Sequence, residues 1–261
     1  MTSPLSPRAR LAGLMMVMSA VGFTIAIALP PVPAHARGWS WEKVVGSGRV
    51  QTETRSPGHF NGVALDLPAD LELRIGATES VTLDTDDNLL PLIETTVENG
   101  TLHIRPSTSR LNFDTRRLKI VVQAKAIDKL ALGGSGSINA DPLRAAKLTI
   151  NIGGSGSITV KSIDADALSV SLGGSGDLKV GGGAASRLSL SIAGSGDVDL
   201  GKLKSVNATV NIAGSGDTTI AARDTLSVTI AGSGDVNYYG DPRVSRTVVG
   251  SGSTNRIGGT R

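Results

Sequence analysis

The sequence predicts an all-β protein that folds as a parallel β-helix. Three observations support this fold class: a Gly-Ser-Gly tripeptide that recurs at a nearly fixed interval, strict alternation of apolar and polar residues around it, and no helical period. Glycine accounts for 33 of the 261 residues, well above the usual share. Its concentration in one repeated tripeptide indicates a periodic structure rather than a low-complexity segment.

The tripeptide defines the repeat. After a separate copy at 46–48, it occurs at 134–136, 154–156, 174–176, 194–196, 214–216, 232–234 and 250–252. Successive starts are 20 residues apart four times and then 18 residues apart twice. A fixed period of this length is typical of solenoids, in which each repeat is one structural unit. Residues 221–225 form a segment two residues shorter than its equivalents, which accounts for the two 18-residue units.

Within each unit, the parity of the positions predicts which side chains are buried. The even positions of one unit are Leu168, Val170, Leu172, Gly174, Gly176, Leu178 and Val180. The odd positions between them are polar or small, as expected of a strand with one buried face. One coil cannot bury such a face, but coils stacked about 4.8 Å apart can. We therefore expect coils of about 20 residues with Gly-Ser-Gly at the corners. The two inward glycines mark where the coil bends or where backbones pack closely, since a side chain there would fill the lumen.

A β-propeller or sandwich built from hairpins is the alternative architecture. Asn-Gly or Asp-Gly turns would support it, and the repeat region contains none. At the end of the repeat, the inward positions become Val244, Arg246 and Val248. A charged residue in this row predicts a cap that closes the core to water and prevents end-to-end stacking.

The preceding half, residues 41–125, is β-rich but irregular. Val63, Leu65 and Leu67 alternate with polar or small residues, and Asn99-Gly100 between two further alternating runs predicts a hairpin. This half is expected to begin the solenoid or to cap it.

The N-terminus has the features of a targeting segment. Arg8 and Arg10 precede an uncharged, mostly apolar stretch at 11–29, and Ala34 and Ala36 fit a signal-peptidase site. We expect a signal peptide at 1–36 that is cleaved after Ala36; an uncleaved anchor is the alternative. Residues 37–57 would then form a lead-in and 58–261 the β-helical domain, with its most regular coils at 130–257. The predicted location is the periplasm, the cell surface or the extracellular space, without a transmembrane anchor after signal removal.

Composition argues against several classes of function. Beyond residue 36 the chain carries 24 basic and 23 acidic side chains, and aromatic residues make up 3% of the whole. Nucleic-acid binding is not expected, because neutralising phosphates requires concentrated Lys and Arg. The absence of cysteine excludes disulfides. Only His59 and His103 follow the targeting segment, so we predict no catalysis and no cofactor.

Polar residues at the corners should form ladders on the outer surface. The first ladder contains the central serines Ser135, Ser155, Ser175, Ser195, Ser215, Ser233 and Ser251. The second contains Ser137, Ser157, Asp177, Asp197, Asp217, Asp235 and Ser253. Stacked carboxylates repel one another, and a hard cation would relieve the repulsion, so the four aspartates are weak candidate metal ligands. The competing interpretation is that each side chain hydrogen-bonds local backbone at its corner.

Several stretches together resemble a known family. They are residues 60–73 (FNGVALDLPADLEL), 87–90 (DNLL), 97–104 (VENGTLHI) and the tandem Gly-Ser-Gly-(Ser/Asp)-(Ile/Val) units. This combination is similar to the head GIN domain family of adhesin-like bacterial envelope proteins. The resemblance implies a right-handed β-helix and assigns no catalytic residues.

The sequence therefore predicts an exported, envelope-associated binding or structural module that uses the flat faces of the solenoid. Its expected partners are a second copy or an envelope glycan or protein. A polysaccharide-active β-helical enzyme and a cation-binding scaffold remain the alternatives.

Overall fold

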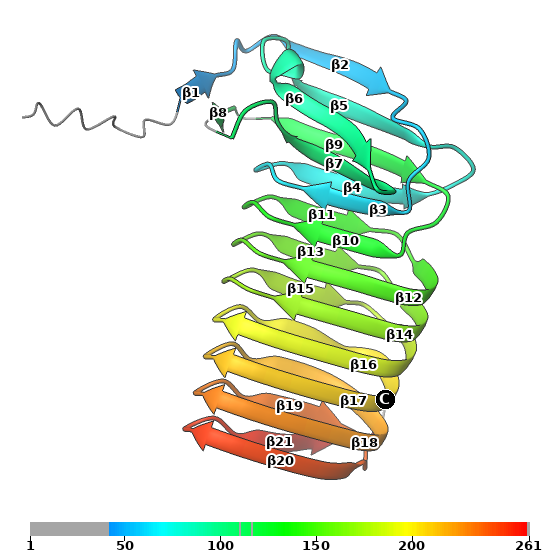
Figure 1. Ribbon diagram of the computed structural model, residues 1–261, viewed down its shortest axis with the longest axis vertical. Coiled ribbons are helices and arrows are strands. Elements are labelled where there is room, and N and C mark those ends of the chain that lie inside the picture. The colour runs from blue at the N-terminus through cyan, green and yellow to red at the C-terminus, as the bar shows by residue number, and fades with distance from the viewer. Residues whose placement is uncertain (1–41, 110, 116, 260–261) are drawn as a thin grey trace, which may run out of the picture. The chain divides into compact units, whose positions relative to one another are not determined.

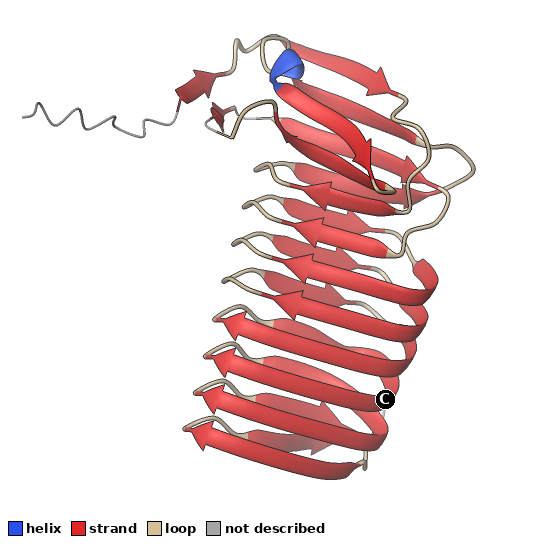
Figure 2. Cartoon of the chain, viewed as in Figure 1, coloured by secondary structure: helices blue, strands red, loops and turns tan. Residues whose placement is uncertain are grey.

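The computed structural model describes residues 42–109, 111–115 and 117–259. These residues form stacked coils of parallel strands, with a single short 3-10 helix at Leu90–Leu92 (Figures 1 and 2). The predicted parallel β-helix is confirmed. The expected signal peptide and its cleavage site lie outside the described residues. No helix among the described residues is long and apolar enough to cross a membrane.

Three columns of parallel strands make up the coils. The first column contains β7 (Thr101–Pro106), β3 (Gly62–Leu65), β10 (Lys129–Leu132), the later parts of β12 (Leu143–Ile152), β14 (Ile163–Leu172), β16 (Gly183–Gly194), β17 (Val198–Gly214) and β18 (Thr218–Gly232), and β20 (Arg243–Gly250). The second contains β9 (Leu118–Ala124), β4 (Asp70–Ile75), β11 (Ser137–Ala140), β13 (Ser157–Val160), β15 (Asp177–Val180), the first residues of β17 and β18, β19 (Val236–Tyr239) and β21 (Thr254–Gly258). The beginnings of β12, β14 and β16 and the middle parts of β17 and β18 form the third.

The register matches the sequence period. Ile150 pairs with Val170, which pairs with Leu190, so that equivalent residues of successive coils lie on top of one another. In the first and second columns, the even-numbered aliphatic residues of the regular coils before the last one are buried, and they belong to one continuous core along the stack. Between β17 and β18, Leu200 pairs with Ile220 but Lys204 pairs with Ala221. The 18-residue coil thus omits residues at this bend and returns to register beyond it.

The Gly-Ser-Gly corners are joined by backbone hydrogen bonds from coil to coil. The Ser175 N–H donates to Gly154 O over 3.2 Å, and the Ser195 N–H donates to Gly174 O over 3.1 Å. A Cβ added at Gly174 would lie 2.3 Å from Gly154 O. One corner backbone therefore packs directly on the next, as expected at these positions. At the second glycine of the corner, a Cβ added at Gly176 would lie 2.4 Å from Gly156 O and also 2.8 Å from the side chain of Ile152 in the core.

The N-terminal half both begins the solenoid and caps it. Strand β5 (Ser80–Asp86) pairs antiparallel with β9, β2 (Val50–Arg55) pairs antiparallel with β5, and β6 (Ile93–Glu98) pairs antiparallel with β7. The β6–β7 hairpin turns at Asn99 and Gly100, whose φ values are +49° and +74°. Both residues of a type I′ turn need positive φ, so the predicted hairpin is confirmed.

The first coils do not follow chain order. Strands β3 and β4 lie between β7 and β9 on one side and β10 and β11 on the other. The coil formed by 101–124 is therefore separated from its successor in sequence by an earlier segment of the chain (Figure 1).

The Gly-Ser-Gly copy at 46–48 is not a corner. It follows β1 (Glu42–Val45), which pairs with β8 (Leu111–Asp114) in a small separate sheet. The Ser47 hydroxyl donates to Asp87, and the Gly48 N–H donates to Oδ1 of the buried Asp86 over 2.9 Å. These bonds join the loop to the turn that follows β5.

The last described coil covers the coil before it but leaves part of its own inward row exposed. Val244 and Val248 are 40% and 38% exposed, although Leu226 and Ile230, which pair with them in β18, are fully buried. Arg246 occupies the predicted inward row between them. The burial of Leu226 and Ile230 agrees with the expectation that this coil closes the core to water, whereas the coil's own inward row stays partly exposed. That Arg246 prevents end-to-end stacking stays a prediction.

The corner geometry leads to a test by Gly174→Ala. The added Cβ would approach Gly154 O at 2.3 Å, and we expect unfolding free energy to fall by about 3 kcal/mol, because backbone on both sides resists movement. Denaturant unfolding followed by circular dichroism measures this change. Gly173→Ala is the matched control, since its Cβ would lie 3.9 Å from the nearest atom and the next coil already has Ala193 there. Equal stability of the two variants would contradict the proposed cause.

Candidate functional site

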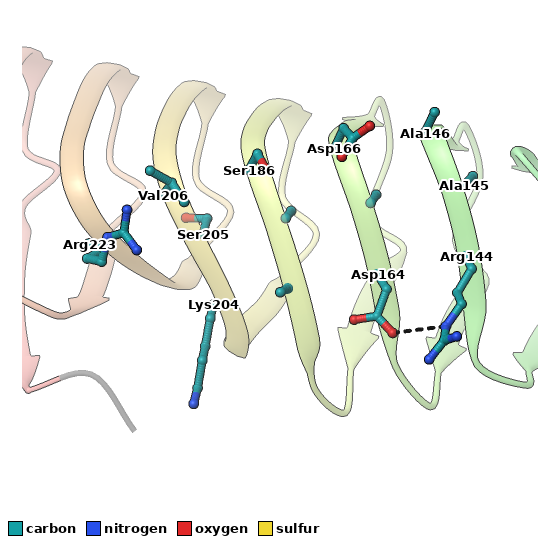
Figure 3. A pocket seen from close by; sticks show the side chains of 13 residues that line it. Arg144, Ala145, Ala146, Asp164, Asp166, Ser186, Lys204, Ser205, Val206 and Arg223 are labelled. Atoms are coloured by element: carbon teal, nitrogen blue, oxygen red, sulfur yellow. Dashed lines mark ion pairs between the residues drawn. The ribbon is translucent and has the colours of Figure 1, made fainter.

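An open groove follows the third column of strands, across the coils from β12 to β18. Its volume is about 940 Å³. The residues that line it are Arg144, Ala145, Ala146, Asp164, Ala165, Asp166, Ala184, Ala185, Ser186, Lys204, Ser205, Val206 and Arg223. Five successive coils each contribute residues to it, so the groove runs along the stack (Figure 3).

The floor is hollow because its residues have short side chains. The residues paired in register along the floor are Ala145, Ala165, Ala185, Ser205 and Ala222. The Ser205 hydroxyl donates to Ala221 O over 2.6 Å, so this buried polar atom is satisfied by the protein itself. The strands bend here: two adjacent residues, Ala146 and Lys147, are both exposed, and the buried parity changes from odd to even.

Charged side chains lie along the rims. Arg144, Asp164 and Lys204 lie along one rim, and Asp166 and Ser186 lie along the other (Figure 3). Arg144 Nε is 3.4 Å from Asp164 Oδ2. Exposed ion pairs contribute little to stability, so these groups remain available to a ligand. The groove can therefore present both signs of charge over an apolar floor.

Sequence reasoning missed this groove. It gave no role to the alanines of the third column. The available signal was the recurrence of alanine at 145, 165 and 185 at the 20-residue period. A column of small residues in a repeat predicts a depression only if the bend of the strand is known.

The predicted serine ladder lies on the exposed side of the corners. Its members Ser155, Ser175, Ser195, Ser215 and Ser233 are all exposed, and they form a row away from the groove. From Ser175 onward, the backbone N–H of each serine in this row donates to a glycine carbonyl of the previous coil. The row is a regular surface of small hydroxyls, and its use as a binding surface stays a prediction.

The aspartate ladder forms a chain of hydrogen bonds between coils. Asp177 Oδ1 accepts from the Asp197 N–H over 3.3 Å, Asp197 Oδ1 from the Asp217 N–H over 3.0 Å, and Asp217 Oδ1 from the Asp235 N–H over 2.8 Å. Asp235 Oδ1 continues the series with the Ser253 N–H. The carboxylates thus bond backbone, as the second interpretation required, but in the next coil rather than at their own corner.

No metal-binding cluster is found within the described part of the chain: no three His, Cys, Asp or Glu side chains are grouped to hold an ion. His59 Nδ1 lies 2.6 Å from Glu79 Oε1 at the surface. His103 lies in β7, paired with Thr96 and Ala64. Neither histidine forms a hydrogen bond with a corner serine among the described residues.

Ion pairs on the second column lower the pKa values of the carboxyl groups beside it. The hydrogen bond from Lys161 holds the pKa of Asp141 below its ordinary value, and the Ile75 N–H acts in the same direction. Lys119 and then Arg74 lower the pKa of Glu72. These carboxyls are therefore held in the charged form by their partners, as expected of structural ion pairs.

Comparison with known proteins places the chain among adhesin-like domains. A family model described as "Putative auto-transporter adhesin, head GIN domain" matches residues 59–242. No match was found among curated proteins.

Solved structures share the fold over most of the chain. A protein from Parabacteroides distasonis ATCC 8503, called "Putative lipid binding protein", is 28% identical with a TM-score of 0.70, and the match covers 83% of this chain and 100% of that one. A "putative adhesin" from Bacteroides fragilis NCTC 9343 is 22% identical with a TM-score of 0.78, over 82% and 100% of the two chains. Another from Parabacteroides merdae ATCC 43184 is 21% identical with a TM-score of 0.70, over 82% and 99%.

The aspartate ladder can be tested at Asp217. Asp217→Ala removes the acceptor of the Asp235 N–H and should lower unfolding free energy by up to about 1 kcal/mol. Asp217→Asn keeps an acceptor oxygen and should change stability by only a few tenths of that amount. Thermal melts with calcium and with a chelator measure both effects. Stabilisation by calcium that Asp217→Asn abolishes would instead support a cation site.

Proposed function

Because the chain belongs to the head GIN domain family, we propose that it is an exported, envelope-associated binding module that performs no catalysis. The groove along the third column carries this proposal, since it is an elongated depression with a charged rim on a rigid stack. An elongated ligand would lie along the coils, over the alanine floor. Binding to such a surface requires no conformational change, because each coil is held in place by its neighbours.

The ligand class follows from the groove chemistry. The floor is apolar, and the rims offer Arg144, Lys204 and Asp166 to polar groups. This combination fits a chain-like envelope component with repeated polar groups, such as a glycan or a lipid-linked glycan. The relative from Parabacteroides distasonis is named for lipid binding, which agrees with a ligand that has an apolar part.

Catalysis on a polysaccharide is the second candidate. It is favoured by one observation: Asp164 and Asp166 lie on opposite rims of the groove (Figure 3). Glycosidases use a pair of carboxylates that flank the substrate. However, both side chains are exposed and Asp164 is paired with Arg144, whereas the general acid of such enzymes needs a desolvated site. Binding is therefore the better supported function.

The location can be tested with antibodies against the folded domain. We expect the protein on the outside of the inner membrane, so labelling should require no disruption of that membrane. Intact cells and cells with a permeabilised outer membrane are compared by fluorescence. Signal from intact cells would place the module on the surface, and signal only after permeabilisation would place it in the periplasm. Labelling that requires lysis of the inner membrane would overturn export.

The groove can be tested by filling it. Ser186 is exposed and lines the groove, so Ser186→Trp should weaken binding of the purified protein to isolated cell envelopes by about tenfold, a loss of about 1.4 kcal/mol. Sedimentation of labelled protein with envelopes gives the affinity. Ser191→Trp is the control, because Ser191 is equally exposed but lies outside the groove. Equal loss in both variants, or loss in neither, would argue against the groove.

A further inference from the structure

The last coil ends in strands that lack a partner on one edge. Strand β20 pairs with β18, and β21 pairs with β19; neither has a second neighbour among the described residues. The unpaired edge of β20 runs over eight residues. A strand edge of this length can accept another extended segment through backbone hydrogen bonds. The N-terminal end differs, because antiparallel strands cover the first parallel coil there.

The inward row of β20 contains one unusual residue. A single column of side chains runs through the stack, and its members are Leu102, Val63, Leu130, Ile150, Val170, Leu190, Val210, Val228 and Arg246. Every residue of this column is aliphatic and buried until the last coil. Arg246 therefore occupies the position at which every earlier coil buries an aliphatic side chain.

Arg246 has no counter-charge in the described chain. Its side chain forms no ion pair or hydrogen bond with another described residue. Arg256 of the neighbouring strand β21 differs: its Nε donates to Gly240 O over 2.7 Å, and Nη1 lies 3.5 Å from Asp241 Oδ1. The guanidinium of Arg246 thus keeps its donors free, between the exposed apolar side chains of Val244 and Val248.

A cleft lies beside this arginine. Its volume is about 390 Å³, and it is lined by Arg246, Val248, Gly252, Ser253, Thr254 and Asn255. The Thr254 hydroxyl is buried and has no hydrogen-bond partner in the described chain. By contrast, the Thr218 hydroxyl two coils earlier in the same column donates to Val198 O. An unsatisfied hydroxyl near a free guanidinium favours a ligand with hydrogen-bond acceptors.

We propose that the C-terminal end of the solenoid binds an extended acidic segment of another protein, which adds to β20 as a further strand. In register, one side chain of that segment lies over Arg246, and its neighbours two residues away cover Val244 and Val248. A carboxylate over Arg246 gives a charge-assisted, bidentate pair. The flanking side chains are apolar, because they continue columns that are apolar throughout the stack.

A second copy of this chain fits the end less well. Two identical ends placed face to face would bring Arg243, Arg246 and Arg256 of each copy together. Like charges at an interface are unfavourable by several kcal/mol. Arg246 therefore disfavours self-association at this edge and at the same time selects an acidic partner.

Synthetic peptides test the proposal with the intact protein. Residues 225–232 of β18 already pair with β20, with Val228 opposite Arg246. The probe is a labelled peptide with this sequence and Val228→Glu, which should repeat the register on the free edge. Fluorescence anisotropy should show binding about tenfold tighter than for the same peptide with Val228→Gln, because only the carboxylate pairs with the charged guanidinium. The Val228→Lys peptide should bind least.

Charge reversal in the protein provides the control. Arg246 is exposed, so Arg246→Glu should fold normally and should exchange the preference, with the Lys peptide now bound more tightly than the Glu peptide. Equal affinities for the three peptides, or no exchange in Arg246→Glu, would overturn the proposal. Sedimentation equilibrium of the unmodified protein completes the test, because a dimer that Arg246→Glu disrupts would show that a second copy occupies the edge.

Discussion

The hydrogen bond from a corner serine N–H to the glycine carbonyl of the previous coil, formed at every corner from Ser175 to Ser251, is the contact on which the regular coils depend. It brings two backbones so close that a Cβ at Gly174 would lie 2.3 Å from Gly154 O. Only glycine fits on both sides of such a contact. Because successive corners repeat it from Ser175 onward, these coils are held in one register against the next, and the apolar columns follow from that register.

Strict register also determines the outer surface. Residues at equivalent positions of successive coils form rows, so a short side chain repeated at 145, 165 and 185 becomes a groove, and an aspartate repeated at 177, 197 and 217 becomes a chain of carboxylate-to-backbone bonds. In a repeat protein, one position of the sequence motif thus produces a row of equivalent side chains along the surface. The proposed binding groove is a consequence of this property, and its charged rim comes from the residues that vary between coils.

The two ends of the stack differ in the strands and side chains that cover the core. At the N-terminal end, β5 and β6 run antiparallel to β9 and β7, which ends the parallel stack and covers its core. At the C-terminal end the inward row changes to Val244, Arg246 and Val248, and two of its side chains are partly exposed. An inward charge is one means by which natural sheets avoid edge-to-edge aggregation. In the proposed interaction the same charge also selects an acidic partner, which a purely protective cap would not need.

The sequence by itself determined the coil, its period, its corners and the buried parity, because these depend on local alternation and on a repeated tripeptide. It also located the hairpin at Asn99-Gly100, whose residues suit positive φ. Only the tertiary structure decided that β3 and β4 lie between coils that are later in the chain, since strand pairing across that distance depends on which edges are free. It likewise decided that the copy at 46–48 bonds a turn instead of forming a corner, and that the alanine column lines a groove. At these positions the same residue types have different roles. Contacts between distant segments and the bend of the strand determine the surroundings of each side chain, and neither is specified by the local sequence.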